Sequence, residues 1–492
     1  MNNLKERAIR GGLAKAVAQA ATLLLRLGSL MILSRLLAPK DFGLVGMVTA
    51  VTGVLNLFRD FGLSTAVVQR GSVSDEQMST LFWINILVGA ILGALTLTTA
   101  PFIAWFYHEP RLVWVTSTLA CGFLFNAAGI QHGTLLQRQM RFTTLASIDI
   151  LSLTLSISSG ILMALAGYRY WALVVMSLMG PFISTICEWV VTRWVPGKPR
   201  KQVGLRSIVR FGGTVTLNGL VVYVAYNLEK ILLGRFWGAG VVGIYGRAFQ
   251  LSNMPTENLN SSIGGVAFSA LSRVQDEPQR LRSYFLKGFA LVLALTLPMT
   301  LLSALFANDT ILVFLGPSWK EAIPIFRLLA PTILIFAMIN PFSWLLFALG
   351  KVGRSLKIAL VIAPLVITGY LIGLPYGPKG VALGYSTSMA LWVVPHIIWC
   401  VRGTPVSVRD AFETLSRPLL SGLVAAANAY LLQISFGSSL SPLLRLASDY
   451  TVFLVVYLGM LFYVMRQKSF YLDLIRGLTR RSPVEEKKLA LA

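Results

Sequence analysis

Polar side chains recur along one face of the first apolar stretch of the chain. Within residues 13–36, Gln19, Thr22 and Arg26 belong to a series at steps of three and four that begins at Lys15 and ends at Ser29. That spacing keeps the side chains on one face of an α-helix. An arginine at the membrane centre costs roughly 2.5–3.5 kcal/mol on an insertion scale, so it is expected to face protein or water. A guanidinium binds phosphate oxygens bidentately, and this face therefore predicts a water-filled cavity for an anionic ligand.

Three further apolar stretches, 43–62, 211–236 and 242–270, carry polar residues of the same kind, and Pro255 in the last predicts a kink or break. Together the stretches define a candidate cavity for an anion or a sugar, and the carboxylates among them are candidates for coupling transport to a proton or sodium ion. The alternative is that these groups hydrogen-bond between helices or anchor helix ends. The candidate cavity residues are Gln19, Thr22, Arg26, Asn56, Arg59, Tyr226, Lys230, Arg247, Gln250 and Asn253, and the candidate coupling carboxylates are Asp60, Glu229 and Glu257.

Motifs of catalysis are missing from the sequence. It contains no G-x-x-x-x-G-K-[ST] loop, no H-E-x-x-H and no nucleophile elbow. The three cysteines lie inside apolar segments, and the three histidines are scattered. We therefore expect no enzyme activity, no metal and no cofactor, and a transport cycle driven by a gradient or by the substrate's own downhill flow.

The amino-acid composition predicts that the elements carrying these residues are membrane-spanning helices. Of 492 residues, 55% are hydrophobic and 13% are charged, against about 25% charged in soluble domains. Apolar runs of about 20 residues recur along the whole chain, which predicts an all-α polytopic membrane protein. The fourteen predicted spans are 13–36, 43–62, 80–106, 112–136, 145–166, 170–193, 211–236, 242–270, 284–306, 322–348, 355–374, 380–401, 414–435 and 443–465.

The chain has a net charge of +23, and the distribution of its Lys and Arg residues between the loops predicts the orientation of the spans. With the N-terminus inside, the inner loops collect about 29 Lys and Arg and the outer loops about 7, as the positive-inside rule requires. Both termini are therefore predicted to be cytoplasmic. Basic runs interleaved with aromatics, as in a nucleic-acid surface, are absent, so no nucleic-acid partner is expected. The outer loops are a few residues long, which leaves no room for a catalytic domain outside.

The chain repeats itself at an offset of 200 residues. The segments 33–46 ("LSRLLAPKDFGLVG") and 233–246 ("LGRFWGAGVVGIYG") share Leu, Arg, Gly and Gly at corresponding positions. Six spans separate the copies, so both have the same orientation, which predicts two six-helix lobes around a central cavity. The predicted parts are an N-terminal lobe (1–195), a basic cytoplasmic linker (196–210), a C-terminal lobe (211–402), two extra helices (403–466) and a cytoplasmic tail (467–492).

Several segments resemble a known family. "SRLLAPKDFGLVGM", "FRDFGLSTAVVQR", "LLGRFWGAGVVGIYGRAFQLSNMP", "ALSRVQDEPQRLRSYF" and "FLGPSWKEAIPIFRLLAP" follow one another from the first span to about the tenth. They are similar to the polysaccharide-transporter branch of the multidrug/oligosaccharidyl-lipid/polysaccharide exporter superfamily. Within it, they look most like exopolysaccharide and lipopolysaccharide flippases of the colanic-acid exporter type.

The resemblance implies a substrate, a membrane and partners. The substrate would be an undecaprenyl-diphosphate-linked oligosaccharide, moved across a bacterial inner membrane by alternating access beside a polymerase and a chain-length regulator. The family motif does not assign the ligand residues, so the candidate residues stand on spacing alone. Two alternatives remain: an ion-coupled antiporter of drugs or other amphiphiles from the same superfamily, and a membrane glycosyltransferase or polymerase. The first would favour a carboxylate-rich cavity, and the second would require a large outer loop.

Overall fold

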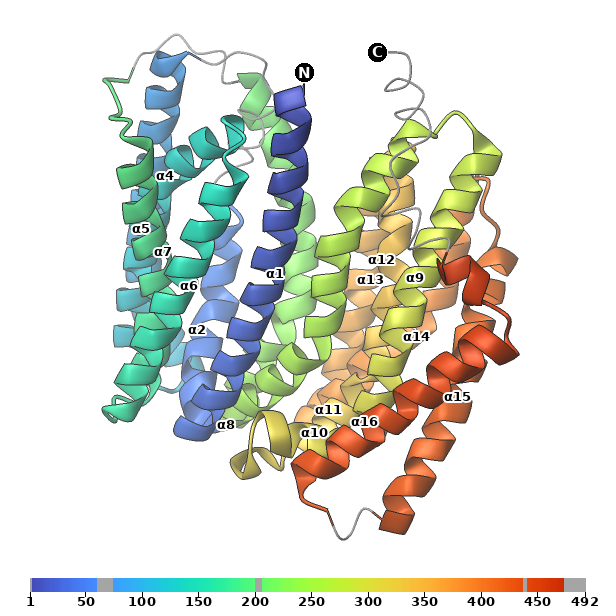
Figure 1. Cartoon of the computed structure of the whole chain (residues 1–492). Helices are drawn as coiled ribbons and strands as arrows, with labels where there is room; N and C mark the ends of the chain where they lie inside the picture. Colours follow the sequence, from blue (N-terminus) through green and yellow to red (C-terminus); the bar gives the residue numbers. More distant parts are fainter. Residues whose placement is uncertain (1, 60–73, 200–205, 437–439, 473–492) are drawn as a thin grey trace. The chain divides into compact units, whose positions relative to one another are not determined.

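The computed structural model describes residues 2–59, 74–199, 206–436 and 440–472, and these are helical nearly throughout (Figure 1). Every predicted span falls on helical structure, although the helix that carries the second span ends at Asn56 and residues 60–62 of that span lie outside the described residues. One short helix and a 3₁₀ turn also form in the outer segment 307–321, between the ninth and tenth predicted spans. The elements in chain order are α1 (Asn2–Leu36), α2 (Pro39–Asn56), α4 (Asp75–Tyr107), α5 (Leu112–Arg138), α6 (Phe142–Leu165), α7 (Tyr170–Thr192), α8 (Arg206–Arg273), α9 (Pro278–Leu305), α10 (Ala307–Phe314), η1 (Pro317–Trp319), α11 (Ala322–Leu329), α12 (Pro331–Ala348), α13 (Val352–Gly373), η2 (Leu374–Tyr376), α14 (Gly377–Val401), α15 (Val408–Phe436), α16 (Pro442–Gly459) and the π turn η4 (Met460–Val464).

Helix α8 contains two predicted spans. They meet at Gly238, whose φ of 80° and ψ of 177° interrupt the helical backbone at the predicted outer turn. Only glycine adopts this conformation without strain. Pro255 lies inside α8 without interrupting the helical backbone. The sequence predicted either a kink or a break at this proline, and the break does not occur.

Nine helical stretches in the described part of the chain are long and apolar enough to cross a membrane. Helices α1, α2 and α8 are not among them. These are the helices that carry the predicted polar faces. The chain is an all-α polytopic membrane protein.

Two compact units can be described separately, and neither is a simple half of the chain. The first comprises residues 1–247, 314–322 and 359–384, and the second comprises 248–313, 323–358 and 385–492. In the first unit α4 packs on α5, α6 on α7 and α1 on α6. Small residues permit the close approach: a Cβ on Gly89 would lie 2.6 Å from the Cβ of Ala127.

The two copies of the repeat contact each other through glycines in the first unit. A Cβ on Gly43 would lie 1.6 Å from the Ala239 carbonyl oxygen, and a Cβ on Gly243 would lie 1.9 Å from the Pro39 carbonyl oxygen. Adding 200 to 43 and to 39 gives 243 and 239, so the repeat operation converts one contact into the other. Such reciprocal contacts are expected at a two-fold axis between equivalent elements, which supports the predicted repeat.

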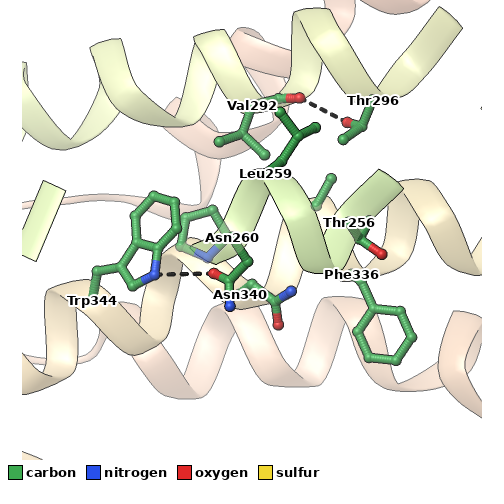
Figure 2. A pocket seen from close by; sticks show the side chains of 10 residues that line it. Thr256, Leu259, Asn260, Val292, Thr296, Phe336, Asn340 and Trp344 are labelled. Carbon is green, nitrogen blue, oxygen red and sulfur yellow. Dashed lines mark hydrogen bonds between the residues drawn. The ribbon is translucent and has the colours of Figure 1, made fainter. Parts of the chain in front are cut away.

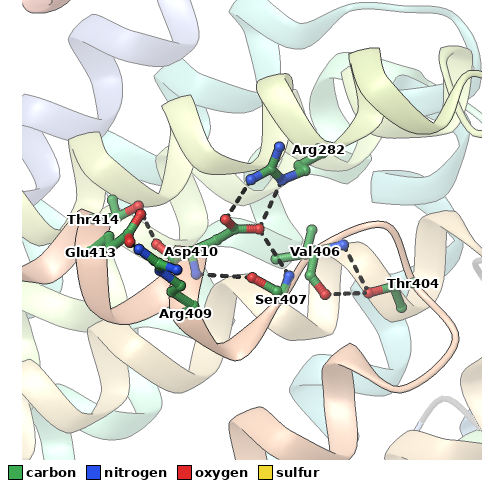
Figure 3. A network of polar contacts seen from close by, with 8 residues as sticks. All are labelled: Arg282, Thr404, Val406, Ser407, Arg409, Asp410, Glu413 and Thr414. Carbon is green, nitrogen blue, oxygen red and sulfur yellow. Dashed lines mark hydrogen bonds and ion pairs between the residues drawn. The ribbon is translucent and has the colours of Figure 1, made fainter.

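The second unit is organised around α9, which packs on α12 and on α15. Phe342 of α12 contacts Phe285 and Phe289 of α9, at ring-centroid distances of 5.1 and 5.7 Å. At the predicted inner end, Arg282 Nε donates to Asp410 Oδ2 at 2.8 Å, which joins α9 to α15 (Figure 3). Asp410 also caps α15, because its backbone N–H donates to Ser407 Oγ and its carboxylate accepts from the Ser407 N–H.

Candidate functional site

The polar face of α1 points to the same side as its buried residues. Leu30 and Leu33, which share the face of Arg26 at steps of four and seven, are 4% and 2% exposed. Leu24, on the opposite face, is 69% exposed, as expected of a lipid-facing residue. Arg26 therefore lies on the same face of α1 as these buried residues, and its own side chain is exposed. The Lys15 side chain lies outside the described residues.

Arg26 itself is exposed and about ten residues from the outer end of α1, or roughly 15 Å at the helical rise. No hydrogen bond or ion pair of its guanidinium is found within the described part of the chain. Thr22 and Gln19, one and two turns before it, are half-buried. The α1 face thus presents a near-midplane guanidinium with its donors available to an anion.

The polar residues of α2 have local partners. Asn56 is exposed and donates to the Thr52 carbonyl oxygen at 3.3 Å. Arg59, just beyond the helix, donates to Asn126 Oδ1 of α5 at 2.8 Å and is half-buried. This contact favours a structural role for Arg59. Asp60 lies outside the described residues, so its predicted coupling role stays a prediction.

Glu229 is the most unusual member of the candidate site. Its side chain is fully buried on α8, and neither carboxylate oxygen has a hydrogen-bond partner among the described residues. The nearest cation is Lys230, whose Nζ lies 3.9 Å from Glu229 Oε1 and donates instead to Asn227 Oδ1 at 2.8 Å. Tyr226, on the preceding turn, is half-buried. An unpaired carboxylate in this position is costly in its charged form.

Tyr223 holds α8 against α2 one to two turns from Glu229. Its hydroxyl donates to the Thr49 carbonyl oxygen at 3.0 Å. The opposing residue is Gly53, where a Cβ would lie 1.8 Å from that hydroxyl oxygen. The contact places the α8 face of Glu229 and Lys230 beside α2, within the first unit.

Arg247 is positioned by an aromatic ring. Its guanidinium carbon lies 3.9 Å from the centroid of the Phe42 ring, and the side chain is half-buried. A guanidinium stacked on an aromatic face is held in place by a cation–π interaction. Phe42 in turn packs edge-on against Trp319, with 5.4 Å between ring centroids.

The remaining candidates, Gln250, Asn253 and Glu257, belong to the second unit. Gln250 and Glu257 are exposed, and the Asn253 carbonyl oxygen accepts a hydrogen bond from Thr256 Oγ1 at 2.9 Å. The structure thus brings nine of the thirteen predicted residues into the first unit and three into the second. Helical spacing did not predict Asn126 or Asn227, the hydrogen-bond partners of Arg59 and Lys230.

A small pocket in the second unit was also not predicted. It lies among α8, α9 and α12 and has room for about one water-sized particle (Figure 2). Its wall is formed by Thr256, Leu259, Asn260, Val292, Thr296, Phe336, Ala337, Asn340, Pro341 and Trp344.

The fold and the polar faces together define a polytopic helical membrane protein with buried and half-buried ionisable groups. A family model described as "Polysaccharide biosynthesis protein" matches residues 32–324, more than half of the chain. The chain belongs to this family, which confirms the resemblance noted in the sequence.

Named relatives agree with the family. The chain is 26% identical over 390 residues to the lipopolysaccharide biosynthesis protein WzxC of Escherichia coli (strain K12), covering 78% of both chains. It is 28% identical over 392 residues to the teichuronic acid biosynthesis protein TuaB of Bacillus subtilis (strain 168), again covering 78% of both. The succinoglycan biosynthesis transport protein ExoT of Rhizobium meliloti (strain 1021) is 22% identical over 339 residues, covering 69% of this chain and 68% of ExoT.

Solved structures share the fold. The lipid II flippase MurJ, in an inward closed conformation, matches 93% of this chain and 99% of its own with a TM-score of 0.72 at 12% identity. An inward-facing multidrug resistance MATE family transporter of the MOP superfamily matches 80% of this chain and 97% of its own, with a TM-score of 0.63 at 15% identity. At these identities the likeness establishes the fold.

Proposed function

We propose that the protein is a flippase. It translocates undecaprenyl-diphosphate-linked oligosaccharide repeat units across the bacterial inner membrane by alternating access, for exopolysaccharide or lipopolysaccharide synthesis. Both termini are cytoplasmic, and the protein works beside a polymerase and a chain-length regulator. Family membership supports the substrate class, as do the biosynthetic roles in the names of WzxC, TuaB and ExoT.

The observation that carries the proposal is the exposed guanidinium of Arg26, which has no partner among the described residues and lies on the face of α1 that also carries Leu30 and Leu33. A diphosphate is the one strongly anionic group of such a substrate, and arginine binds it through paired N–H donors. Lys230 and Arg247 add positive charge, while amides and hydroxyls on the same faces can hydrogen-bond to sugars. No covalent bond needs to form or break, so the proposal describes a transporter rather than an enzyme.

Transport in proteoliposomes tests the proposal. Purified protein is reconstituted into vesicles with a fluorescent lipid-diphosphate-linked oligosaccharide, and the fraction reaching the opposite leaflet is measured with a membrane-impermeant quencher. We expect faster exchange than in protein-free vesicles, with imposed proton and sodium gradients tested in turn. Efflux of a lipophilic cationic dye by the same vesicles, without oligosaccharide flipping, would favour the drug-antiporter alternative.

A further inference from the structure

Two turns of the second unit carry basic residues in a part of the sequence that has no acidic ones. Residues 322–409 contain no Asp and no Glu. Within them, Lys351, Arg354 and Lys357 lie in and just before the first turns of α13, and Arg402 directly follows α14. We call these four residues the α13–α14 basic cluster. Both turns are predicted inner loops, so the cluster is expected at the inner surface of the membrane.

The two turns are held together through backbone carbonyls. Gly350 (φ 68°) separates α12 from α13, and Gly403 (φ 66°) follows α14; glycine adopts this left-handed conformation without strain. Across the two turns, Lys351 Nζ donates to the Gly403 carbonyl oxygen, and Arg354 Nη1 donates to the Arg402 carbonyl oxygen at 2.6 Å. The cations of α13 therefore lie directly beside the end of α14, at the residue where Arg402 adds its own charge.

These backbone contacts use few of the donors in the cluster. Arg354 also donates to the Trp399 and Cys400 carbonyl oxygens, both at 3.3 Å, and again through Nη1. No hydrogen bond of its Nε or Nη2 is found among the described residues. Lys357 and Arg402 are exposed and have no hydrogen bond or ion pair in the described part of the chain. The cluster therefore retains guanidinium and ammonium donors for a ligand.

The positive charge of the cluster is largely uncompensated. The carbonyls at the end of α14 carry the equivalent of about half a negative charge, against four cations. The first acidic residues that follow in the chain, Asp410 and Glu413, are already paired with Arg282 and Arg409 (Figure 3). Most of the positive charge is thus available to attract an anion.

An exposed apolar stripe of α14 leads to the cluster. Leu391, Val394 and Ile398 lie at steps of three and four, on one face of the helix, and are 66%, 44% and 38% exposed. Ile398 lies one turn before Arg402. Cations at the membrane boundary beside apolar side chains at greater depth match a phospholipid, whose phosphate lies at the boundary and whose acyl chains lie along the helix.

We propose that the α13–α14 basic cluster binds the headgroup of an anionic phospholipid of the inner leaflet. Arginine binds phosphate oxygens through paired N–H donors, and lysine adds point charge. A zwitterionic headgroup carries an amine that these cations repel, so the site favours an anionic lipid. Basic pockets at the cytoplasmic ends of membrane helices hold cardiolipin headgroups in this way. The site goes beyond the proposed function, because lipid binding here requires no transport of oligosaccharide.

Thermal unfolding of the purified full-length protein in a non-ionic detergent tests the site. Cardiolipin or phosphatidylcholine is added at equal molar fractions, and inorganic diphosphate is added at the same phosphate concentration. A ligand that binds only the folded protein raises the unfolding temperature as its concentration passes Kd. We expect a saturable rise with cardiolipin that neither phosphatidylcholine nor diphosphate reproduces. An equal rise with phosphatidylcholine, or with diphosphate, would overturn the assignment to an anionic lipid.

Matched variants localise the effect. Lys357→Gln combined with Arg402→Gln removes two exposed cations that bond to no other described residue. Arg280→Gln combined with Arg409→Gln removes two exposed cations on the same predicted side, outside the cluster. Both pairs lose the same charge, so general electrostatic attraction would weaken equally in both.

We expect the cardiolipin concentration for half of the maximal rise to increase roughly 30-fold in the cluster variant and to stay near the wild-type value in the control. Arg402→Gln alone, with an expected increase of roughly fivefold, replaces the double variant if that protein fails to fold. Equal changes in the cluster variant and the control, or no change in the cluster variant, would refute the site.

Discussion

Glu229 combines complete burial with the absence of a hydrogen-bonding partner among the described residues. A buried carboxyl group avoids the cost of desolvating its charge by binding a proton. If opening of the site lets Glu229 release that proton, the residue could couple flipping to a pH gradient. Lys230, at 3.9 Å, is too far for a hydrogen bond but close enough to favour the charged form when water enters.

Glu229→Gln tests this coupling because the amide keeps the shape and removes the titratable group. We expect the stimulation of flipping by an imposed pH gradient to fall roughly tenfold. The unfolding temperature should hold or rise, since the amide cannot become a buried charge that lacks hydrogen-bond donors. Glu277→Gln, at an exposed carboxylate paired with Arg280 outside the candidate site, is the control. Unchanged stimulation in Glu229→Gln would exclude Glu229 as the coupling group.

Glu109, in the loop after α4, is held by Arg111 through two hydrogen bonds of 2.8 and 2.9 Å. Its pKa is lowered, chiefly by the hydrogen bonds from Arg111. A lowered pKa means that the contribution to stability is present above the unfolded-state pKa and is lost as the pH falls through the folded-state pKa. We expect wild type to exceed Glu109→Gln in unfolding free energy by about 0.2–1 kcal/mol at pH 7. Thermal melts should show the gap closing toward pH 3, and a gap independent of pH would contradict this account.

At the scale of elements, the crossing of α2 and α8 depends on glycine. Gly43→Ala and Gly243→Ala would place a Cβ within 1.6 and 1.9 Å of a backbone oxygen. Overpacking of this kind typically costs about 1–3 kcal/mol. We expect a lower unfolding temperature and loss of flipping for either change. Gly246→Ala, where a Cβ meets nothing within 4 Å, should behave as wild type. A neutral effect of Gly43→Ala would mean that the helices do not cross this closely.

Much of the element-level structure could be predicted from the sequence, because membrane spans are long and apolar. Within the described residues, each of the fourteen predicted spans coincides with helical structure over most of its length, and the outer turn inside α8 lies at Gly238 as expected. The pocket among α8, α9 and α12 could not be predicted. Helical spacing describes one helix at a time, and Asn260, Thr296 and Asn340 come together only through packing of three helices distant in the chain. For the same reason, the contact between Arg59 and Asn126 was not expected.

At the scale of the whole molecule, the asymmetry of Lys and Arg between loops predicts which side each loop faces. Met140 lies in a predicted inner loop, and Tyr168 lies in a predicted outer loop; both are exposed. In intact cells, a membrane-impermeant maleimide should label Tyr168→Cys and leave Met140→Cys unlabelled until the membrane is opened. The reverse labelling pattern would overturn the proposed orientation with cytoplasmic termini.

The central claim is that Arg26 recognises the anionic diphosphate of the substrate, and flipping by Arg26 variants tests it most directly. Hydrogen bonds to charged groups contribute about 1.5–3 kcal/mol, so Arg26→Ala should slow flipping roughly 10–150-fold. Arg26→Lys should recover part of the rate, because it keeps the charge and loses the bidentate geometry. Arg35→Ala is the control, since Arg35 donates to the Met31 carbonyl oxygen near the outer end of α1. Folded Arg26→Ala protein that flips the substrate at the wild-type rate would contradict the account.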